Sequence, residues 1–354
     1  MITRALQTLI QRESYWLQKK ISGALEKRFV IFPAGPTAQT FYHTLKNEYG
    51  IEAKCFVDNS SALNGKSVCG KPVMTPEALN GGNDFVLIPT SRKFYSQISV
   101  QLESAGFTEY MHADAFCACQ LWDRYAAAAS LLIDDTSRNA YFGAIYSLMT
   151  GDNSFIQYES DTYFSIREFA NTSLETIVDA GAFVGDTVEK YVERGSEGLK
   201  LYAFEPYEPA FLKLAARVER LKKEWILGDD DIQILPAGIG AKTEQISFSM
   251  GCQTMLKPNE RGEIKLQVYS LDDFFKDKTP FTLLKADIEG GEMDLLRGAE
   301  ALIRCNKPKM ALCIYHSPRD FAQIVEYVHE LVPEYKMSVR NHYPNYQDTV
   351  LYTS

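Results

Sequence analysis

Apolar residues recur along this chain in two different patterns. Residues 1–27 place apolar side chains, among them Leu6, Leu17 and Ile21, at the three- and four-residue spacing of an amphipathic helix. Further on, short apolar runs alternate with helical stretches, which is the pattern of parallel strands joined by helices. The sequence therefore predicts an α/β protein that begins with an N-terminal helix. That helix packs on its own domain, pairs with a second copy in a homo-oligomer, or lies on a membrane surface.

Residues 28–121 are predicted to form a small Rossmann-like accessory domain. Strands at 28–32, 52–57 and 84–89 alternate with helical segments. Gly35 ends the first strand and Asp58 follows the second, which imitates a dinucleotide-binding fingerprint. Only one glycine is present in the turn, however, and Pro36 lacks the backbone N–H that a phosphate needs. The domain either binds a nucleotide or serves packing and partner contact.

Residues 122–172 are predicted to be a helical connector, and residues 173–354 a larger α/β domain. In that domain we expect strands at 176–180, 199–204, 231–235, 282–286 and 310–315, and a closing hairpin of 335–340 with 349–352. Tyr163 and Phe164 lie just before the first of these strands. They either cover a cofactor or join the cores of the two domains.

Composition narrows the class of protein. A chain of 354 residues fits two domains, and its 45% hydrophobic content fits a soluble protein. The net charge of −9 argues against nucleic acid as a partner. Seven cysteines without a C-x-x-C pair favour free thiols in a reducing cytoplasm over disulfides or zinc. No long uninterrupted apolar run is present, so no transmembrane helix is expected.

The turn after the first strand of the larger domain carries the first candidate binding residues. Asp179 ends the strand, Gly181 and Gly185 allow the backbone to approach a ligand, and the next helix starts near Asp186. The G-x-x-x-G spacing lacks the arrangement that a dinucleotide pyrophosphate requires. It favours S-adenosylmethionine, whose amino-acid tail and ribose would lie against this turn.

The next two strands end in further candidate cofactor contacts. Glu205 and Pro206 follow the second strand, where a carboxylate accepts hydrogen bonds from both hydroxyls of a ribose. Ala237 and Gly238, in the segment 236–240 after the third strand, would lie alongside the adenine.

The fourth and fifth strands end in the residues closest to the expected chemistry. Asp287 ends the fourth strand, Glu289 follows it, and His316 lies just past the fifth. We predict these three as catalytic, with His316 as the base because its ordinary pKa is near neutrality. They alternatively hold a divalent cation, but a metal is not predicted. Glu292 and Asp294 begin the following helix, where negative charge is favourable in any case.

Taken in order, these segments resemble the FkbM-type methyltransferases. The resemblance rests on residues 178–181, 185–186, 204–206, 285–290 with Glu292, 314–316, 340–342 and 350–352. It implies a class I methyltransferase sheet, mostly parallel with an antiparallel terminal hairpin. Some members of the family also carry a Rossmann-like N-terminal domain. The resemblance further implies transfer of a methyl group from S-adenosylmethionine to an acceptor oxygen, often a sugar hydroxyl.

The sequence therefore predicts a cytoplasmic O-methyltransferase that acts on a sugar or glycan-related small molecule. One alternative is a non-catalytic module that binds a nucleotide-sugar or a protein on the same fold. A nicotinamide-dependent oxidoreductase is a poorer alternative, because the turn at Gly35 and Pro36 is badly suited to a pyrophosphate.

Overall fold

The computed structural model describes residues 2–195, 197–250, 256–258 and 264–354. The chain forms two compact units. The N-terminal unit comprises Met1–Asp123 with Ile145–Asp152, and the C-terminal unit comprises Arg124–Ala144 with Asn153–Ser354. Cys252 lies outside the described residues, and the other six cysteines are free thiols.

The N-terminal unit is built on a six-stranded sheet with the order β3-β4-β2-β1-β5-β6. Its strands are β1 (Arg28–Ile31), β2 (Cys55–Val57), β3 (Ser67–Val68), β4 (Lys71–Met74), β5 (Asp84–Ile88) and β6 (Tyr110–His112). Its helices are α1 (Ile2–Gly23), α2 (Pro36–Tyr49), α3 (Arg92–Ser104) and α4 (Ala113–Ala118), with short 3₁₀ turns at Pro76–Ala78 and Cys119–Leu121. Only β3 pairs antiparallel with its neighbour. The unit is thus an α/β fold.

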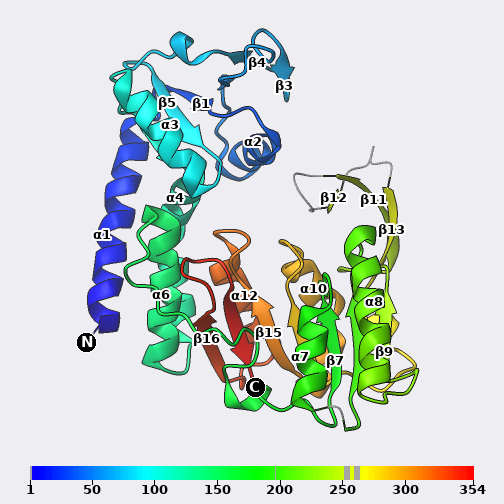
Figure 1. Ribbon diagram of the computed structural model, residues 1–354. Coiled ribbons are helices and arrows are strands. Elements are labelled where there is room, and N and C mark those ends of the chain that lie inside the picture. Colours follow the sequence, from blue (N-terminus) through cyan, green and yellow to red (C-terminus); the bar gives the residue numbers. More distant parts are fainter. Residues whose placement is uncertain (1, 196, 251–255, 259–263) are drawn as a thin grey trace. The chain divides into compact units, whose positions relative to one another are not determined.

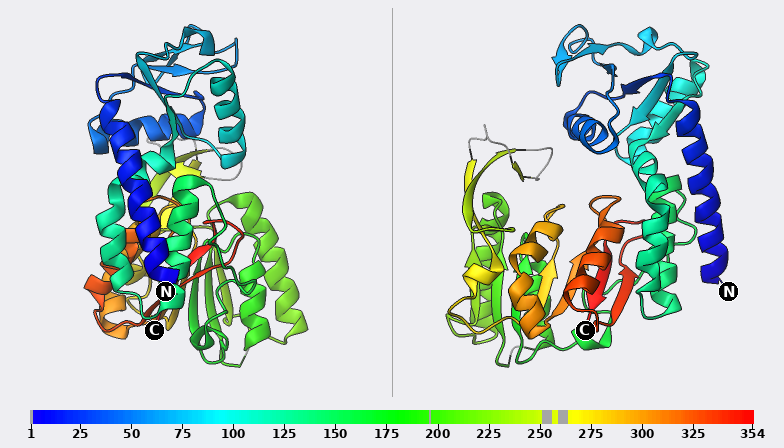
Figure 2. Two further views of the ribbon diagram at one scale, coloured as in Figure 1. Left: turned by 90° about the vertical axis from the view of Figure 1, so that its left-hand side faces the viewer. Right: turned by 180° about the vertical axis from the view of Figure 1, so that it is seen from behind.

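Helix α1 buries its apolar stripe within its own unit. Leu6, Ile10, Leu17 and Ile21 are buried, and the helix contacts α4 and the 3₁₀ turn at Cys119–Leu121. Figure 2 shows α1 as a long, unbroken blue helix. The apolar side chains along one face of α1 therefore belong to the core of the N-terminal unit, as expected for a helix that packs on its own domain.

Asp58, the residue that imitates the acid of a dinucleotide-binding fingerprint, forms hydrogen bonds with the backbone of its own unit. Asp58 accepts hydrogen bonds from the N–H groups of Ala34 (3.0 Å) and Ser60 (2.8 Å), one on each carboxylate oxygen. Asp58 thus fixes the turn that follows β1. This use of the carboxylate favours the packing interpretation of the N-terminal unit over nucleotide binding.

Two helices and a short turn follow the sheet of the N-terminal unit in the sequence. They are α5 (Trp122–Ser130), α6 (Asp135–Thr150) and a 3₁₀ turn at Arg167–Phe169.

The C-terminal unit is built on a seven-stranded sheet with the order β16-β17-β15-β14-β7-β8-β9 (Figure 1). Its strands are β7 (Thr176–Ala180), β8 (Lys200–Phe204), β9 (Ile232–Leu235), β14 (Leu283–Ala286), β15 (Lys309–Cys313), β16 (Met337–Asn341) and β17 (Thr349–Thr353). The first five of these run parallel, and β17 pairs antiparallel with both β15 and β16. The predicted fold class, a mostly parallel sheet with an antiparallel terminal hairpin, is confirmed.

Helices of the C-terminal unit cover the sheet with apolar faces. They are α7 (Asp186–Arg194), α8 (Glu208–Glu224), α9 (Leu271–Phe274), α10 (Glu292–Gly298), α11 (Glu300–Asn306) and α12 (Asp320–Leu331). Helices α7 and α8 lie side by side (Figure 1) and bury Val188 and Leu214 against Ile177 and Leu201 of the strands. This packing fixes the start of α7 beside the end of β7. Within the described residues, no helix combines the length and apolar character needed to cross a membrane.

A second, four-stranded sheet was not predicted from the sequence. It has the order β10-β13-β11-β12 and comprises β10 (Gly238–Ile239), β11 (Glu244–Met250), β12 (Leu256–Pro258) and β13 (Ile264–Tyr269). Gly238 pairs with Val268 of β13. The segment expected to lie along the adenine is therefore also part of this small sheet.

The strand register brings the predicted site residues to one edge of the large sheet. Asp179 of β7 lies opposite Lys285 of β14 on one side and Ala203 of β8 on the other. The segments that begin at Gly181, Glu205 and Asp287 consequently leave the sheet at the same level. In open α/β sheets this carboxyl edge is where ligands bind.

Candidate functional site

A cavity of about 450 Å³ opens at this carboxyl edge of the C-terminal unit. Its size suits a small organic ligand. The residues that line it are Thr162, Tyr163, Gly181, Phe183, Asp186, Thr187, Lys190, Glu205, Pro206, Tyr207, Lys285, Asp287, Ile288, Glu289 and Asp348. Most of them come from the segments that follow β7, β8 and β14, so the cavity lies where the sequence places the cofactor.

The turn after β7 depends on Gly181. Its φ of +77° lies in the left-handed region, and a Cβ atom added there would lie 1.9 Å from the carbonyl oxygen of Asp287. Only glycine lets the turn pass this closely to the end of β14. The turn continues through Phe183 and Gly185 into α7, whose first residue, Asp186, lines the cavity. The N-terminus of α7 thereby presents backbone N–H groups near the cavity.

Glu205 is held in place by two backbone N–H groups. One carboxylate oxygen accepts a hydrogen bond from the N–H of Phe183 (2.8 Å) and the other from the N–H of Tyr207 (2.7 Å). Burial raises the pKa of Glu205, and these two donors offset part of that effect. Each carboxylate oxygen has a second lone pair, so Glu205 retains acceptors for two ligand hydroxyls.

Asp179 does not line the cavity, in contrast to the direct cofactor contact predicted from the sequence. Its side chain is fully buried and forms an ion pair of 2.9 Å with the ammonium group of Lys285. Lys285 also donates hydrogen bonds to the carbonyl oxygens of Ala180 (3.3 Å) and Gly181 (2.7 Å). Asp179 therefore acts behind the cavity wall, where it holds the lysine that fixes the glycine turn.

Asp287 faces the cavity and is surrounded by donors. It accepts hydrogen bonds from the hydroxyl groups of Tyr163 (2.9 Å) and Tyr315 (3.3 Å). Burial would raise the pKa of Asp287, but contacts with His316, Lys285 and Tyr163 outweigh it and hold that pKa well below its usual range. The carboxylate is therefore ionised and rigidly oriented.

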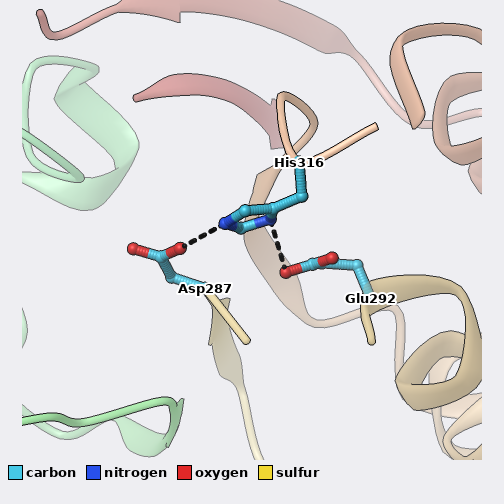
Figure 3. Close-up of side chains that lie close together, drawn as sticks. All are labelled: Asp287, Glu292 and His316. Carbon is cyan, nitrogen blue, oxygen red and sulfur yellow. Dashed lines mark ion pairs between the residues drawn. The ribbon is translucent and has the colours of Figure 1, made fainter. Parts of the chain in front are cut away.

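His316 lies behind Asp287 and between two carboxylates (Figure 3). Its Nε2 atom is 3.3 Å from Asp287 Oδ1, and its Nδ1 atom is 3.1 Å from Glu292 Oε1. Burial alone would lower the pKa of His316, but contacts with the two acids outweigh it and raise that pKa to about 10. An imidazolium has no free lone pair, so in this state His316 is not the base that the sequence predicts.

The two glutamates of this segment occupy very different environments. Glu289 adopts a left-handed φ of +58°, lines the cavity and is 57% exposed. Glu292 is only 1% exposed, and its carboxylate accepts hydrogen bonds from the N–H groups of Ile288 (2.9 Å) and Gly290 (3.1 Å). The sequence prediction gave Glu292 only a role at the helix start, and the structure adds its contact with His316.

The structure brings some predicted residues together and leaves others outside. Gly181, Asp186, Glu205, Pro206, Asp287 and Glu289 line the described cavity, whereas Asp179, Gly185, Ala237, Gly238 and His316 do not. Sequence reasoning missed Lys285, Lys190 and Asp348 as lining residues. Lys285 lies within the motif itself, and Asp348 directly precedes β17. No periodic signal marks Lys190, which lies on the first turns of α7.

By its strand order and the place of its cavity, this chain has the fold of a class I methyltransferase. Residues 179–335 match the family model described as "Methyltransferase FkbM domain", so this part of the chain is a domain of the FkbM-type methyltransferases. The resemblance predicted from the sequence is thus confirmed. The chain carries a methyltransferase domain of this family over its C-terminal half.

One solved structure agrees with this assignment at the level of the fold. Methyltransferase FkbM from Methylobacillus flagellatus KT superposes with a TM-score of 0.60 at 18% sequence identity, covering 99% of this chain and 100% of that chain. Fibrillarin from Aeropyrum pernix, solved with natively bound S-adenosyl-L-methionine, gives a TM-score of 0.32 at 11% identity, with coverage of 54% and 71%. No curated protein matches the chain.

Proposed function

We propose that the C-terminal unit transfers a methyl group from S-adenosylmethionine to a hydroxyl group of a sugar or glycan-related small molecule. The observation that carries this proposal is the arrangement of Glu205 at the cavity. Its carboxylate is held by two backbone donors and keeps lone pairs for two further hydroxyls, which suits the ribose of the cofactor.

The remaining cofactor contacts follow from the placement of the cavity residues. The turn at Gly181 and the N-terminus of α7 present backbone N–H groups to the amino-acid tail. Lys285 holds the carbonyl groups of that turn, with Asp179 as its counter-ion. We also propose that Ala237 and Gly238 lie near the adenine, as the sequence predicts, although they do not line the described cavity.

The cofactor, when bound, supplies an electrophilic sulfonium methyl group. The chain must then align the acceptor hydroxyl with that group, and such positioning is worth on the order of 7–11 kcal/mol. Asp287 and Glu289 line the cavity, whereas His316 is 8% exposed and lies behind them. We therefore assign the hydrogen bond from the acceptor hydroxyl to these two carboxylates. We assign the uptake of its proton to Glu289, because burial raises the pKa of Glu289 whereas the pKa of Asp287 is held well below its usual range. His316 acts as a positioning residue for Asp287.

The character of the cavity wall supports a polyhydroxylated acceptor. Asp287, Glu289 and Asp348 contribute carboxylate acceptors, and Thr162 contributes a hydroxyl. Several hydroxyls of a sugar can donate to such a wall at the same time. Free thiols at the described cysteines also support a reducing compartment, and we propose that the protein acts in the cytoplasm.

Turnover tests this proposal directly. The full chain is incubated with S-adenosylmethionine and a panel of sugars, nucleotide-sugars and glycans. We expect S-adenosylhomocysteine to form together with an acceptor that has gained the mass of one methylene. A chain that binds S-adenosylhomocysteine but methylates no hydroxyl acceptor would instead support the alternative of a non-catalytic binding module.

Glu205→Gln is expected to weaken the binding of S-adenosylhomocysteine by roughly 10- to 100-fold. The substitution removes charge-assisted hydrogen bonds, each worth about 1.5–3 kcal/mol, and its amide nitrogen cannot accept from the backbone. Equilibrium dialysis measures the dissociation constant, and thermal unfolding reports whether the turn stays folded. Glu208→Gln, an exposed acid at the start of α8, serves as the matched control. Equal dissociation constants for the two variants would contradict the ribose assignment.

A further inference from the structure

We propose that Asp287, Glu292 and His316 form a binding site for a divalent cation of the Mn²⁺ type beside the methyl-transfer cavity. The inference deepens the proposed function and rests on it for the role of the ion. The binding of the ion itself is testable without turnover. The sequence alone leaves open a cation site formed by Asp287, Glu289 and His316. In the site proposed from the structure, Glu292 takes the place of Glu289.

The three side chains converge from separate elements of the C-terminal unit. Asp287 follows β14, Glu292 begins α10, and His316 lies just past β15. One carboxylate oxygen from each acid and one ring nitrogen all lie within 4.8 Å of one another. Figure 3 shows both carboxylates directed at the imidazole ring. Two acids and one imidazole within this span are a ligand set that suits a transition-metal ion.

His316 supplies the independent observation that points to a ligand. Its side chain is 8% exposed, yet neither ring nitrogen makes a hydrogen bond to the described residues. The carboxylate oxygens of Asp287 and Glu292 lie within 3.3 Å but not in hydrogen-bonding directions. A buried polar ring without such bonds costs free energy. Coordination of a cation by one ring nitrogen, with release of the proton that this nitrogen carries in the metal-free chain, would supply the missing directional partner.

Hydrogen-bond donors around Asp287 and Glu292 orient the two carboxylates. Metal ligands in proteins are oriented by outer-shell partners in the same way. The backbone N–H groups of Ile288 and Gly290 each bind one oxygen of Glu292. The hydroxyls of Tyr163 and Tyr315 bind the two oxygens of Asp287. Both carboxylates are thus fixed in place before any ion arrives, which lowers the entropic cost of binding it.

The ligand set also indicates which ion is preferred and what it does. Carboxylates suit Mg²⁺ and Mn²⁺, whereas imidazole suits transition metals, so the mixed set favours Mn²⁺. Asp287 lines the cavity, so positions around the ion remain open toward the acceptor. A cation there lowers the pKa of an acceptor hydroxyl. The proton passes to Glu289 as the oxygen–methyl bond forms and the sulfur–methyl bond breaks.

Titration with Mn²⁺ alone tests the site in the full chain. The protein is treated with chelator and dialysed, and free Mn²⁺ is followed by its electron paramagnetic resonance signal. We expect one Mn²⁺ per chain, with affinity reduced at least tenfold in Glu292→Gln and in His316→Gln. Asp294→Asn, an exposed acid on the same helix that pairs with Arg297, is expected to bind as the wild type does. Equal affinity in all four proteins, or no stoichiometric binding, overturns the proposal.

A second measurement on the unaltered chain covers the case in which the variants do not fold. A coordinated histidine gives a ¹⁴N coupling in the pulsed spectrum of bound Mn²⁺, and we expect that coupling here. Its absence overturns the site. S-adenosylhomocysteine binding in the metal-free chain separates the two proposals. If it binds while Mn²⁺ does not, only the cation site fails. If Mn²⁺ binds while S-adenosylhomocysteine does not, only the proposed function fails.

Discussion

Replacing Asp287 by asparagine is expected to lower kcat for methyl transfer by about 10²-fold, the order of loss that misplacement of a reacting group causes. The amide lacks the negative charge that orients the acceptor hydroxyl. It also faces the Tyr163 and Tyr315 hydroxyls with one acceptor oxygen instead of two. The rate of S-adenosylhomocysteine formation at saturating cofactor and acceptor measures the effect.

Binding of S-adenosylhomocysteine provides the necessary comparison for this variant. Because Glu205 and the glycine turn carry most of the proposed cofactor contacts, we expect its dissociation constant to change far less than kcat. Asp294→Asn, which alters an exposed acid in the same segment, is expected to leave both quantities unchanged. If Asp287→Asn keeps wild-type kcat, the carboxylate has no part in the chemistry.

Gly181→Ala is expected to destabilise the C-terminal unit by about 2–5 kcal/mol and to abolish cofactor binding. The added methyl group would overlap the carbonyl oxygen of Asp287 at 1.9 Å, and the left-handed φ of +77° adds its own cost. Relief requires the turn after β7 to move away from β14, which dismantles the cavity. Denaturant unfolding and binding of S-adenosylhomocysteine measure the two effects.

Gly290→Ala is the matched control for this prediction. Gly290 also has a positive φ, of +99°, but the nearest atom to an added Cβ lies 3.9 Å away. Only the conformational cost of roughly 1–2 kcal/mol applies there. Similar losses of stability in the two variants would show that close packing of Gly181 against Asp287 is unimportant.

The sequence predicts the large sheet well because its strands are short apolar runs bounded by turns. The predicted first strand of the C-terminal unit, 176–180, coincides with β7, and the strand predicted at 231–235 is one residue longer than β9. The small sheet escaped prediction for a physical reason. Strands such as β10, of two residues, bury little apolar surface, and their pairing with β13 depends on tertiary contacts.

The candidate site was predictable as a location but not in all of its contacts. The motifs identify Glu205 and Asp287 because each directly follows a strand. The pairing of Asp179 with Lys285 depends on the register between β7 and β14, which no local pattern encodes. Likewise, local sequence cannot show that Glu292 turns inward to His316 while Glu289, only three residues earlier, faces the cavity.

Calorimetric titration of the full chain with S-adenosylhomocysteine tests the central claim most directly. The account predicts saturable binding of one molecule per chain, weakened in Glu205→Gln and intact in Glu208→Gln. Absence of saturable binding would contradict the claim that this edge of the sheet holds the methyl donor. An equal dissociation constant in the wild type and in Glu205→Gln would contradict it as well.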